Sequence, residues 1–207
     1  MTKTFLHLGC GPQYKNGTTP EFMRDDWDEV RLDIDETVKP DIIASMTDMS
    51  VVESNSFDAI YSSHNIEHLF AHEVPIALKE MHRVLKDDGF LVITCPDIQV
   101  VAEFIAKGQL TEKLYDSGMG PISPIDILYG HRDSIKQGNH YMAHKVGFTA
   151  GVLNSTLIGV GFKSSAVARQ IKHYNLWGIS YKNIQLERNE LAEELSKHAN
   201  LEFLADE

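Results

Sequence analysis

The feature that most constrains the fold is a short apolar strand that ends in a glycine turn near the N-terminus. Residues 4–8 read Thr-Phe-Leu-His-Leu, and Gly9-Cys10-Gly11 follow at once. Because glycine lacks a Cβ, such a turn lets the backbone bend tightly and approach a ligand closely. In a doubly wound α/β sheet, ligands bind beyond the carboxyl ends of the strands, beside the first strand. The turn predicts a ligand site there, although alone it is a weak signal.

Strands and helices are expected to alternate after this turn. Apolar residues recur every three or four positions over 73–85, which predicts an amphipathic helix, and Gly89 stands where a helix stop belongs. Asp97 is placed to cap a second helix that runs to about residue 107. Further strands are expected at 29–33, 41–44, 57–62 and 90–95, with one helical turn at 21–24.

The C-terminal part predicts a helix over 149–160, strands over 161–169 and 173–182, and a helix over 183–199. The connection between these two strands is too short for a parallel crossover, so they should pair antiparallel. The whole pattern predicts an α/β fold. We expect a Rossmann-like, seven-stranded, mostly parallel sheet with a C-terminal antiparallel hairpin and helices on both faces. Residues 1–207 are interpreted as a single domain, with the glycine-rich segment 108–147 as an insertion within it.

Composition excludes several classes of protein. Lys and Arg number 19 against 30 Asp and Glu, for a net charge of −11, which disfavours a general nucleic-acid binder. No apolar run approaches the roughly 20 residues that span a bilayer, so no membrane association is expected. Cys10 and Cys95 form no CxxC pair, which favours a reducing, cytoplasmic location.

An acidic residue is the next feature to expect in a nucleotide-binding sheet, at the end of the second strand and about 20 residues after the glycine turn. Asp33 stands there and can accept hydrogen bonds from ribose hydroxyls. A nicotinamide-binding G-x-G-x-x-G motif is disfavoured, because its last glycine would fall on Tyr14.

Six segments in this order resemble class I S-adenosylmethionine-dependent methyltransferases, most closely the small "type 11" group. They lie at residues 6–11, 33, 47–49, 57–61, 63–69 and 80–89. A looser likeness continues through Gly147-Phe148-Thr149 and residues 159–162. The chain departs from the family at Gln13, where a third glycine is usual, and at Asp87-Asp88-Gly89, where Pro-Gly-Gly is usual.

The resemblance implies S-adenosyl-L-methionine as the cofactor and assigns its contacts. Gly9, Cys10 and Gly11 would wrap the methionine part, and Asp33 would hold the ribose. Asp48 would take the adenine amino group, with Met49 supplying a backbone amide and apolar cover. Ser63 and His64 would border the methionine end and the transferred methyl group.

The run His64-Asn65-Ile66-Glu67-His68 also matches H-x-x-E-H, the zinc pattern of inverzincin proteases. On a helix, His64 and His68 would share a face and grip one metal ion. The motif lies instead directly after a strand of an α/β sheet. There the resemblance makes Glu67 and His68 helix-starting and packing residues, and no metal site is predicted.

The reaction implied is methyl transfer to a small-molecule or saccharide-type acceptor, with oxygen favoured over nitrogen. No Asn-Pro-Pro-Tyr motif follows the fourth strand, which disfavours methylation of nucleobase amino groups. His64 is a candidate catalytic residue, and so are His140 and His144, because the insertion should cover the strand ends where an acceptor enters. A neighbouring histidine, His131, completes that group, whose structural alternative is simple loop hydrogen bonding. The alternative function is a non-catalytic protein that binds S-adenosylmethionine or S-adenosylhomocysteine. The sequence predicts no oligomeric state.

Overall fold

A seven-stranded sheet organises the chain in this computed structural model, which describes residues 2–118 and 120–199. The strand order is β3-β2-β1-β4-β5-β9-β8, and only β9 runs antiparallel to its neighbours, β5 and β8. The predicted fold class and C-terminal hairpin are thereby confirmed. The strands are β1 (Lys3–Leu8), β2 (Trp27–Asp33), β3 (Ile42–Ile43), β4 (Phe57–Ser63), β5 (Leu85–Pro96), β8 (Ser164–Gln170) and β9 (Asn175–Tyr181).

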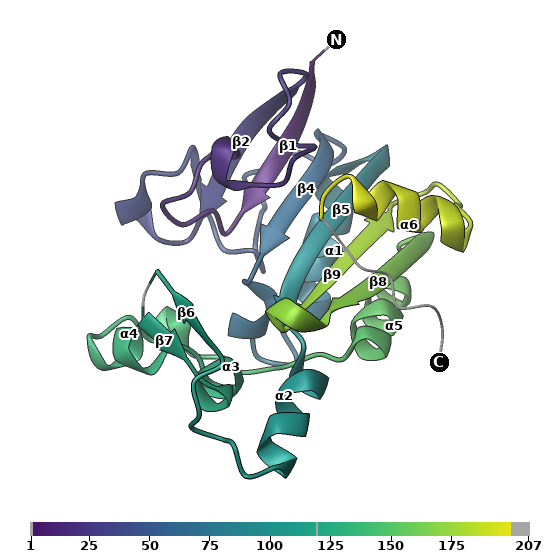
Figure 1. Ribbon diagram of the computed structural model, residues 1–207. Helices are drawn as coiled ribbons and strands as arrows, with labels where there is room; N and C mark the ends of the chain where they lie inside the picture. Colours follow the sequence, from purple (N-terminus) through teal and green to yellow (C-terminus); the bar gives the residue numbers. More distant parts are fainter. Residues whose placement is uncertain (1, 119, 200–207) are drawn as a thin grey trace.

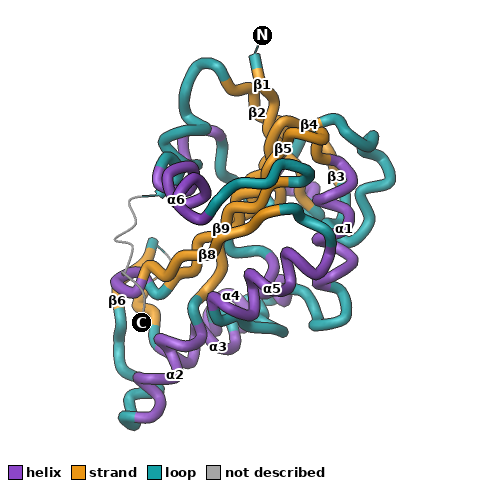
Figure 2. The backbone as a smooth tube through the Cα atoms, turned by 90° about the vertical axis from the view of Figure 1, so that its right-hand side faces the viewer, coloured by secondary structure: helices purple, strands orange, loops and turns teal. Residues whose placement is uncertain are grey.

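Helices cover both faces of this sheet, as Figure 2 shows with the sheet turned nearly edge-on. One face packs against α1 (Val74–Val84) and α5 (Ala150–Val160), where Leu78 and Leu157 are fully buried. The other face carries an aromatic cluster around Phe22 and is covered by α6 (Arg188–Ser196). Alternate residues of the buried strands feed these two cores, because successive side chains of a strand point to opposite faces.

The segment between α2 (Ile98–Ala106) and α5 forms a separate small layer (Figure 1). It holds the hairpin β6 (Tyr115–Ser117) and β7 (Gly120–Ile122), then α3 (Pro124–Tyr129) and α4 (Arg132–Lys136). In Figure 1 these teal elements lie beyond the carboxyl ends of β1 and β4. Short 3-10 turns complete the fold at Lys15–Gly17, Glu36–Val38, Ile66–His68, His140–Met142 and Ile171–His173.

The prediction that Gly89 stops the first helix is wrong. Helix α1 ends at Val84, and β5 begins at once, because Leu85 already pairs with Phe57 of β4. A register shift in this pairing accommodates residues 86–89. Lys182 draws this segment onto the sheet, since its Nζ donates to the Leu85 carbonyl at 2.7 Å and its backbone N–H donates to the Gly89 carbonyl at 3.0 Å.

Other boundaries also differ from the prediction. The one helical turn expected at 21–24 begins earlier, because the Met23 N–H donates to the Thr19 carbonyl at 3.0 Å, and β8 begins at Ser164 instead of 161. Helix α6 begins at Arg188, five residues after the predicted start at 183. The later start follows from a capping box, in which Glu187 and Glu190 exchange side-chain and backbone hydrogen bonds. Among the helices of the described residues, none is long and apolar enough to cross a membrane.

Asp97 joins three elements at the carboxyl end of β5. It is fully buried, and it caps α2 as predicted, with Oδ1 accepting from the Gln99 N–H at 3.0 Å. Its Oδ2 accepts from Arg169 Nε of β8 at 2.6 Å. One carboxylate therefore ties the start of α2 to the edge of the sheet.

Replacing Asp97 should destabilise the fold in two separable steps. Asp97→Asn retains an acceptor for the cap but leaves Arg169 without its carboxylate, whereas Asp97→Ala removes both interactions. We expect Asp97→Ala to lower the free energy of unfolding by more than the ~1 kcal/mol of a lost cap, and Asp97→Asn to fall between it and the native chain. Urea unfolding measures both. Equal losses for the two variants would show that the cap contributes nothing.

His198 should make the fold acid-sensitive. Its ring is buried against Phe22 and Phe90, and its Nδ1 lies 2.9 Å from the Thr19 hydroxyl oxygen. Burial lowers the pKa of His198 from 6.5 to about 4, despite the opposing charge of Glu194. Between these values the unfolded chain binds the proton and the folded chain does not, so stability is lost as the pH falls from about 6.5 to about 4.

The effect can be measured as the change in unfolding free energy with pH. The native chain should lose up to about 3 kcal/mol of unfolding free energy as the pH falls through this interval. We expect His198→Phe, which retains an aromatic ring, to lose less. The same substitution at His72, which is exposed, should leave the pH dependence unchanged. An unaltered slope in His198→Phe would contradict the assignment.

Candidate active site

A cavity of about 690 Å³ lies between the carboxyl ends of the strands and the 108–147 segment. Its volume is in the range of small-molecule and cofactor sites. One end is lined by the glycine turn, the end of β2 and the residues after β3 and β4. The other end is lined by the turn after β4 and by residues of the 108–147 segment, among them Tyr115, Asp126, His131, Tyr141 and His144.

The glycine turn is shaped by close packing as well as by its backbone angles. Gly9 and Gly11 have φ values of +65° and +51°, which side chains disfavour. A Cβ on Gly9 would also lie 2.3 Å from Oδ1 of Asn65. That amide is held in place because its Nδ2 donates to the carbonyls of Leu8 and Ser63, each at 3.0 Å. Glycine at position 9 therefore lets β1 and the turn after β4 approach each other.

Asp33 fastens the glycine turn to the end of β2. Its Oδ2 accepts from the Gly11 N–H at 2.7 Å, and its Oδ1 accepts from the Asp35 N–H at 2.9 Å. A carboxylate has about four acceptor positions, so acceptor capacity remains for a ligand's hydroxyl groups. Asp33 lines the cavity, in the position where the resemblance requires a ribose-binding acid.

Arg31 supports the glycine turn by hydrogen bonds, and the sequence-based prediction did not include it. The residue is 3% exposed, and its guanidinium donates to the carbonyls of Gly11 at 2.7 Å and Gln13 at 3.0 Å. It also donates to the Lys39 carbonyl at 2.8 Å and lies 4.1 Å from the centre of the Tyr14 ring. Gln13 and Tyr14, which depart from glycine-rich motifs, are thus parts of an arginine-centred support.

The other predicted cofactor contacts fall into two groups. Cys10, Ser63 and His64 line the cavity. Burial raises the pKa of the Cys10 thiol to about 11, so it is neutral at physiological pH.

The predicted adenine contacts, Asp48 and Met49, lie elsewhere among the described residues. The Asp48 carboxylate accepts from the Ser50 N–H in a separate surface hollow, and the Met49 side chain is fully buried in the core. Met46 and Thr47 line the cavity beside them.

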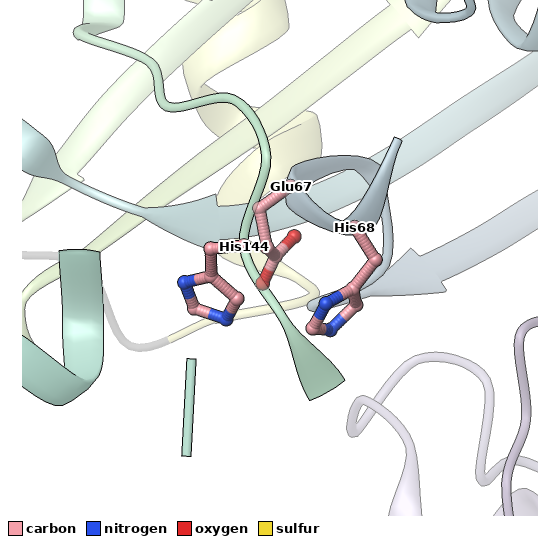
Figure 3. A group of neighbouring side chains, drawn as sticks. All are labelled: Glu67, His68 and His144. Carbon is pink, nitrogen blue, oxygen red and sulfur yellow. The ribbon is translucent and has the colours of Figure 1, made fainter. Parts of the chain in front are cut away.

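Three side chains converge at the other end of the cavity (Figure 3). Glu67 and His68 come from the turn after β4, and His144 comes from the end of the 108–147 segment; their ligand atoms lie within 4.8 Å of one another. Glu67 is 1% exposed, and neither carboxylate oxygen has a hydrogen-bond partner among the described residues. The nearest ionisable neighbour is His64, whose Nδ1 lies 3.3 Å from Glu67 Oε1.

Burial and charge oppose each other in this cluster. Burial raises the pKa of the Glu67 carboxyl, but the imidazoles of His64 and His68 outweigh it and leave the pKa below its usual value. Burial lowers the pKa of His144, and the Glu67 carboxylate compensates only in part. At neutral pH the cluster therefore combines an ionised carboxylate with a neutral His144 imidazole.

The predicted histidines are placed differently from one another. His144 lines the cavity, as does His131, whose Nδ1 accepts from the Ser134 N–H at the start of α4. His140 is exposed and is not among the described lining residues.

The helical geometry that the zinc motif would need is absent, because His64 has a φ of +54° and precedes the 3-10 turn Ile66–His68. Helix α1 starts only at Val74, so Glu67 and His68 do not start it.

Comparison with known families identifies the same N-terminal part of the chain that carries the motifs. Residues 6–93 match the family model of a methyltransferase domain. Residues beyond position 93, which include the 108–147 segment, fall outside this match. Curated proteins give no match to the sequence.

Solved structures share the fold over most of the chain. The 1,6-didemethyltoxoflavin N1-methyltransferase of Burkholderia thailandensis was solved with bound 1,6-didemethyltoxoflavin and S-adenosylhomocysteine. It is 14% identical with a TM-score of 0.55, covering 88% of this chain and 72% of that one. A possible histamine N-methyltransferase of Thermotoga maritima is 13% identical (TM-score 0.53; 88% and 83% covered). An S-adenosylmethionine-dependent methyltransferase of Archaeoglobus fulgidus is 14% identical (TM-score 0.54; 87% and 86% covered).

The resemblance to the methyltransferase family is therefore confirmed over residues 6–93, and it supports the enzyme class and the S-adenosylmethionine cofactor that it implies. The solved structures confirm the fold. The residues that contact the cofactor and the acceptor remain predictions.

Asp33 should be central to cofactor binding. We expect Asp33→Ala to weaken S-adenosylmethionine binding about 10- to 100-fold, because it removes a charged acceptor and releases the Gly11 N–H that shapes the turn. Asp48→Ala should weaken it less, since the Asp48 side chain points to Ser50. Calorimetric titration measures both dissociation constants. An equal loss of affinity in the two variants would show that Asp48 also contributes to cofactor binding. An unchanged dissociation constant in Asp33→Ala would show that Asp33 does not.

Proposed function

We propose that this S-adenosylmethionine-dependent methyltransferase transfers its methyl group to a hydroxyl oxygen of a small, polar acceptor of saccharide type. The observation that carries the proposal is the composition of the cavity wall. Its acceptor end combines aromatic rings, at Tyr115, Tyr141 and Tyr174, with hydrogen-bonding residues, at Asn139 and Asn175. Rings for stacking and polar groups for hydroxyls together suit a ligand with many hydroxyl groups.

The charge of the cavity supports the exclusion of nucleic acids as acceptors. Five carboxylates of the described residues line it, at Asp33, Asp35, Glu67, Glu73 and Asp126, against one ammonium group, at Lys145, and only the Asp126 carboxylate among these five is paired with an arginine, Arg132. Such a wall attracts the cationic sulfonium of the cofactor and repels phosphate groups. Neutral or cationic acceptors are therefore favoured. The names of two similar structures mention N-methylation, but at 13–14% identity this likeness concerns the fold.

Residues 108–147 are proposed as the acceptor-side cover of a single domain. They line the end of the cavity away from the glycine turn, and they lie outside the matched methyltransferase region. The cover excludes water while the donor and the acceptor are aligned, and this positioning supplies much of the rate of such a transfer.

His64 is proposed as the base that takes the acceptor's proton. It lines the cavity directly after β4, and its side chain is 42% exposed. Its φ of +54° is a strained backbone conformation of the kind that clusters at functional sites. Donation from Nδ1 to the Glu67 carboxylate, 3.3 Å away, would leave Nε2 free to accept a proton.

The step balances without any further reactant. The acceptor oxygen forms a bond to the methyl carbon as the bond from that carbon to sulfur breaks. The hydroxyl proton passes to His64 Nε2, and S-adenosylhomocysteine leaves with the electron pair of the broken bond. His144, which has a ring nitrogen within 4.8 Å of the Glu67 carboxylate, is proposed to assist at this end of the cavity, whereas His140 is exposed and lies outside this group.

The function is tested by incubating the protein with methyl-labelled S-adenosylmethionine and a panel of saccharides, phenols and amines. We expect label transfer and S-adenosylhomocysteine release with hydroxylated acceptors. Transfer to amines alone would overturn the preference for oxygen. Cofactor binding without transfer to any member of a broad panel would favour the non-catalytic alternative.

A substitution at His64 separates proton transfer from binding. We expect His64→Asn to lower kcat by about 10²- to 10⁴-fold, the usual contribution of a general base, with little change in S-adenosylmethionine affinity. Asparagine is chosen because it tolerates a positive φ. His72→Asn, at an exposed histidine, is the matched control and should retain activity. Normal turnover in His64→Asn would exclude it as the base.

A further inference from the structure

We propose that Glu67, His68 and His144 form a binding site for one divalent transition-metal ion at the acceptor end of the cavity. Two imidazoles and one carboxylate are the donor set of the facial triad that binds such ions and leaves open positions for a substrate. The ligand atoms of these three residues already lie within 4.8 Å of one another (Figure 3). The sequence motif suggested a different pair, His64 and His68, which the fold does not place on one helical face.

The buried carboxylate of Glu67 is the first independent argument. Burying a carboxylate to 1% exposure, with no hydrogen bond to either oxygen among the described residues, is costly unless a partner compensates it. The His64 contact at 3.3 Å compensates only one side of it. Figure 3 shows the carboxylate directed into the space between the imidazoles of His68 and His144. A cation bound there satisfies the charge.

The tautomers of the two histidines are the second argument. His68 Nδ1 lies 3.2 Å from the Ala143 carbonyl oxygen, and His144 Nδ1 lies 2.7 Å from that of Ile127. A carbonyl only accepts, so each Nδ1 carries the proton and donates it. In each ring Nε2 is therefore the atom left to bind a metal ion. Metal-binding histidines have this arrangement, in which a backbone carbonyl orients the ring and sets its tautomer.

The local backbone supports the site from both sides. The N–H groups of Lys145 and Val146 donate to the Glu67 carbonyl at 2.8 and 3.3 Å, so the segment that carries His144 is tied to the turn that carries the other two ligands. Bonds of 2.0–2.2 Å to a common ion bring ligand atoms about 3 to 3.5 Å apart. Small rotations of the side chains provide the remaining approach.

The position of the site suggests what the ion does. All three ligands line the cavity together with His64, the proposed base. A bound ion can take an acceptor oxygen at an open coordination position and lower the pKa of that hydroxyl group. Two neighbouring oxygens of a diol would fit adjacent open positions. This role rests on the proposed function, whereas the binding of the ion does not.

Metal binding is tested on the full chain, purified without a polyhistidine tag and treated with a chelator. Co²⁺ is titrated by visible absorption, and Zn²⁺ and Mn²⁺ by calorimetry. We expect one ion per chain for at least one of these metals. Glu67→Gln and His144→Gln should each lose more than the 10- to 100-fold in affinity that outer-shell substitutions cost. His72→Gln, an exposed histidine outside the cluster, should bind as the native chain does.

Several outcomes would overturn the site. These are no binding of any of the three ions, or equal binding by all variants, which would place the ion elsewhere. Circular dichroism and S-adenosylmethionine titration of each variant establish that it is folded, and the two ligand variants test the site independently. A metal-free chain that binds S-adenosylmethionine and methylates at full rate refutes the ion's role but leaves the proposed function intact. A chain that binds the metal ion but not S-adenosylmethionine refutes the proposed function and leaves the metal site intact.

Discussion

The buried guanidinium of Arg31 is the constraint on which the cofactor end of the cavity depends. Two loops meet beside the end of β2: the glycine turn after β1 and the segment that ends at Lys39, whose regular structure is limited to the 3-10 turn Glu36–Val38. Arg31 donates to carbonyls of both loops and packs against Tyr14. Only arginine offers five donors in a rigid plane, so a lysine could not satisfy the same set of carbonyls. The loops are therefore placed before a ligand arrives, which reduces the entropy lost on binding.

The parts of the fold that follow from local pattern were predictable. The apolar strands, the periodicity of α1, the cap at Asp97 and the short connection between β8 and β9 all depend on neighbouring residues. Gly89 misled the prediction, because a distant residue, Lys182, decides the conformation there. Tertiary contacts of this kind override a local stop signal.

The site shows the same division. Asp33 and the glycine turn follow from spacing along the chain, and the structure places them together. The cluster at the acceptor end does not, because His144 lies far from Glu67 in sequence and is brought to it by backbone hydrogen bonds. Arg31 leaves no motif either, since its role depends on where loop carbonyls point. The two ends of the cavity thus differ in how visible they are to sequence analysis.

The hydrogen bonds from Lys145 and Val146 to Glu67 have a consequence for how such a protein can diverge. They anchor the returning end of the 108–147 segment to the sheet side of the molecule, and α3 adds a second anchor through the Ile127 and Tyr129 carbonyls, which accept from His144. The hairpin β6–β7 and α4 provide neither anchor, so they can change in length and composition while His144 keeps its place. Selectivity and reactivity are thereby carried by separate modules, and a lineage can acquire a new acceptor by exchanging the outer module without rebuilding the chemistry beneath it.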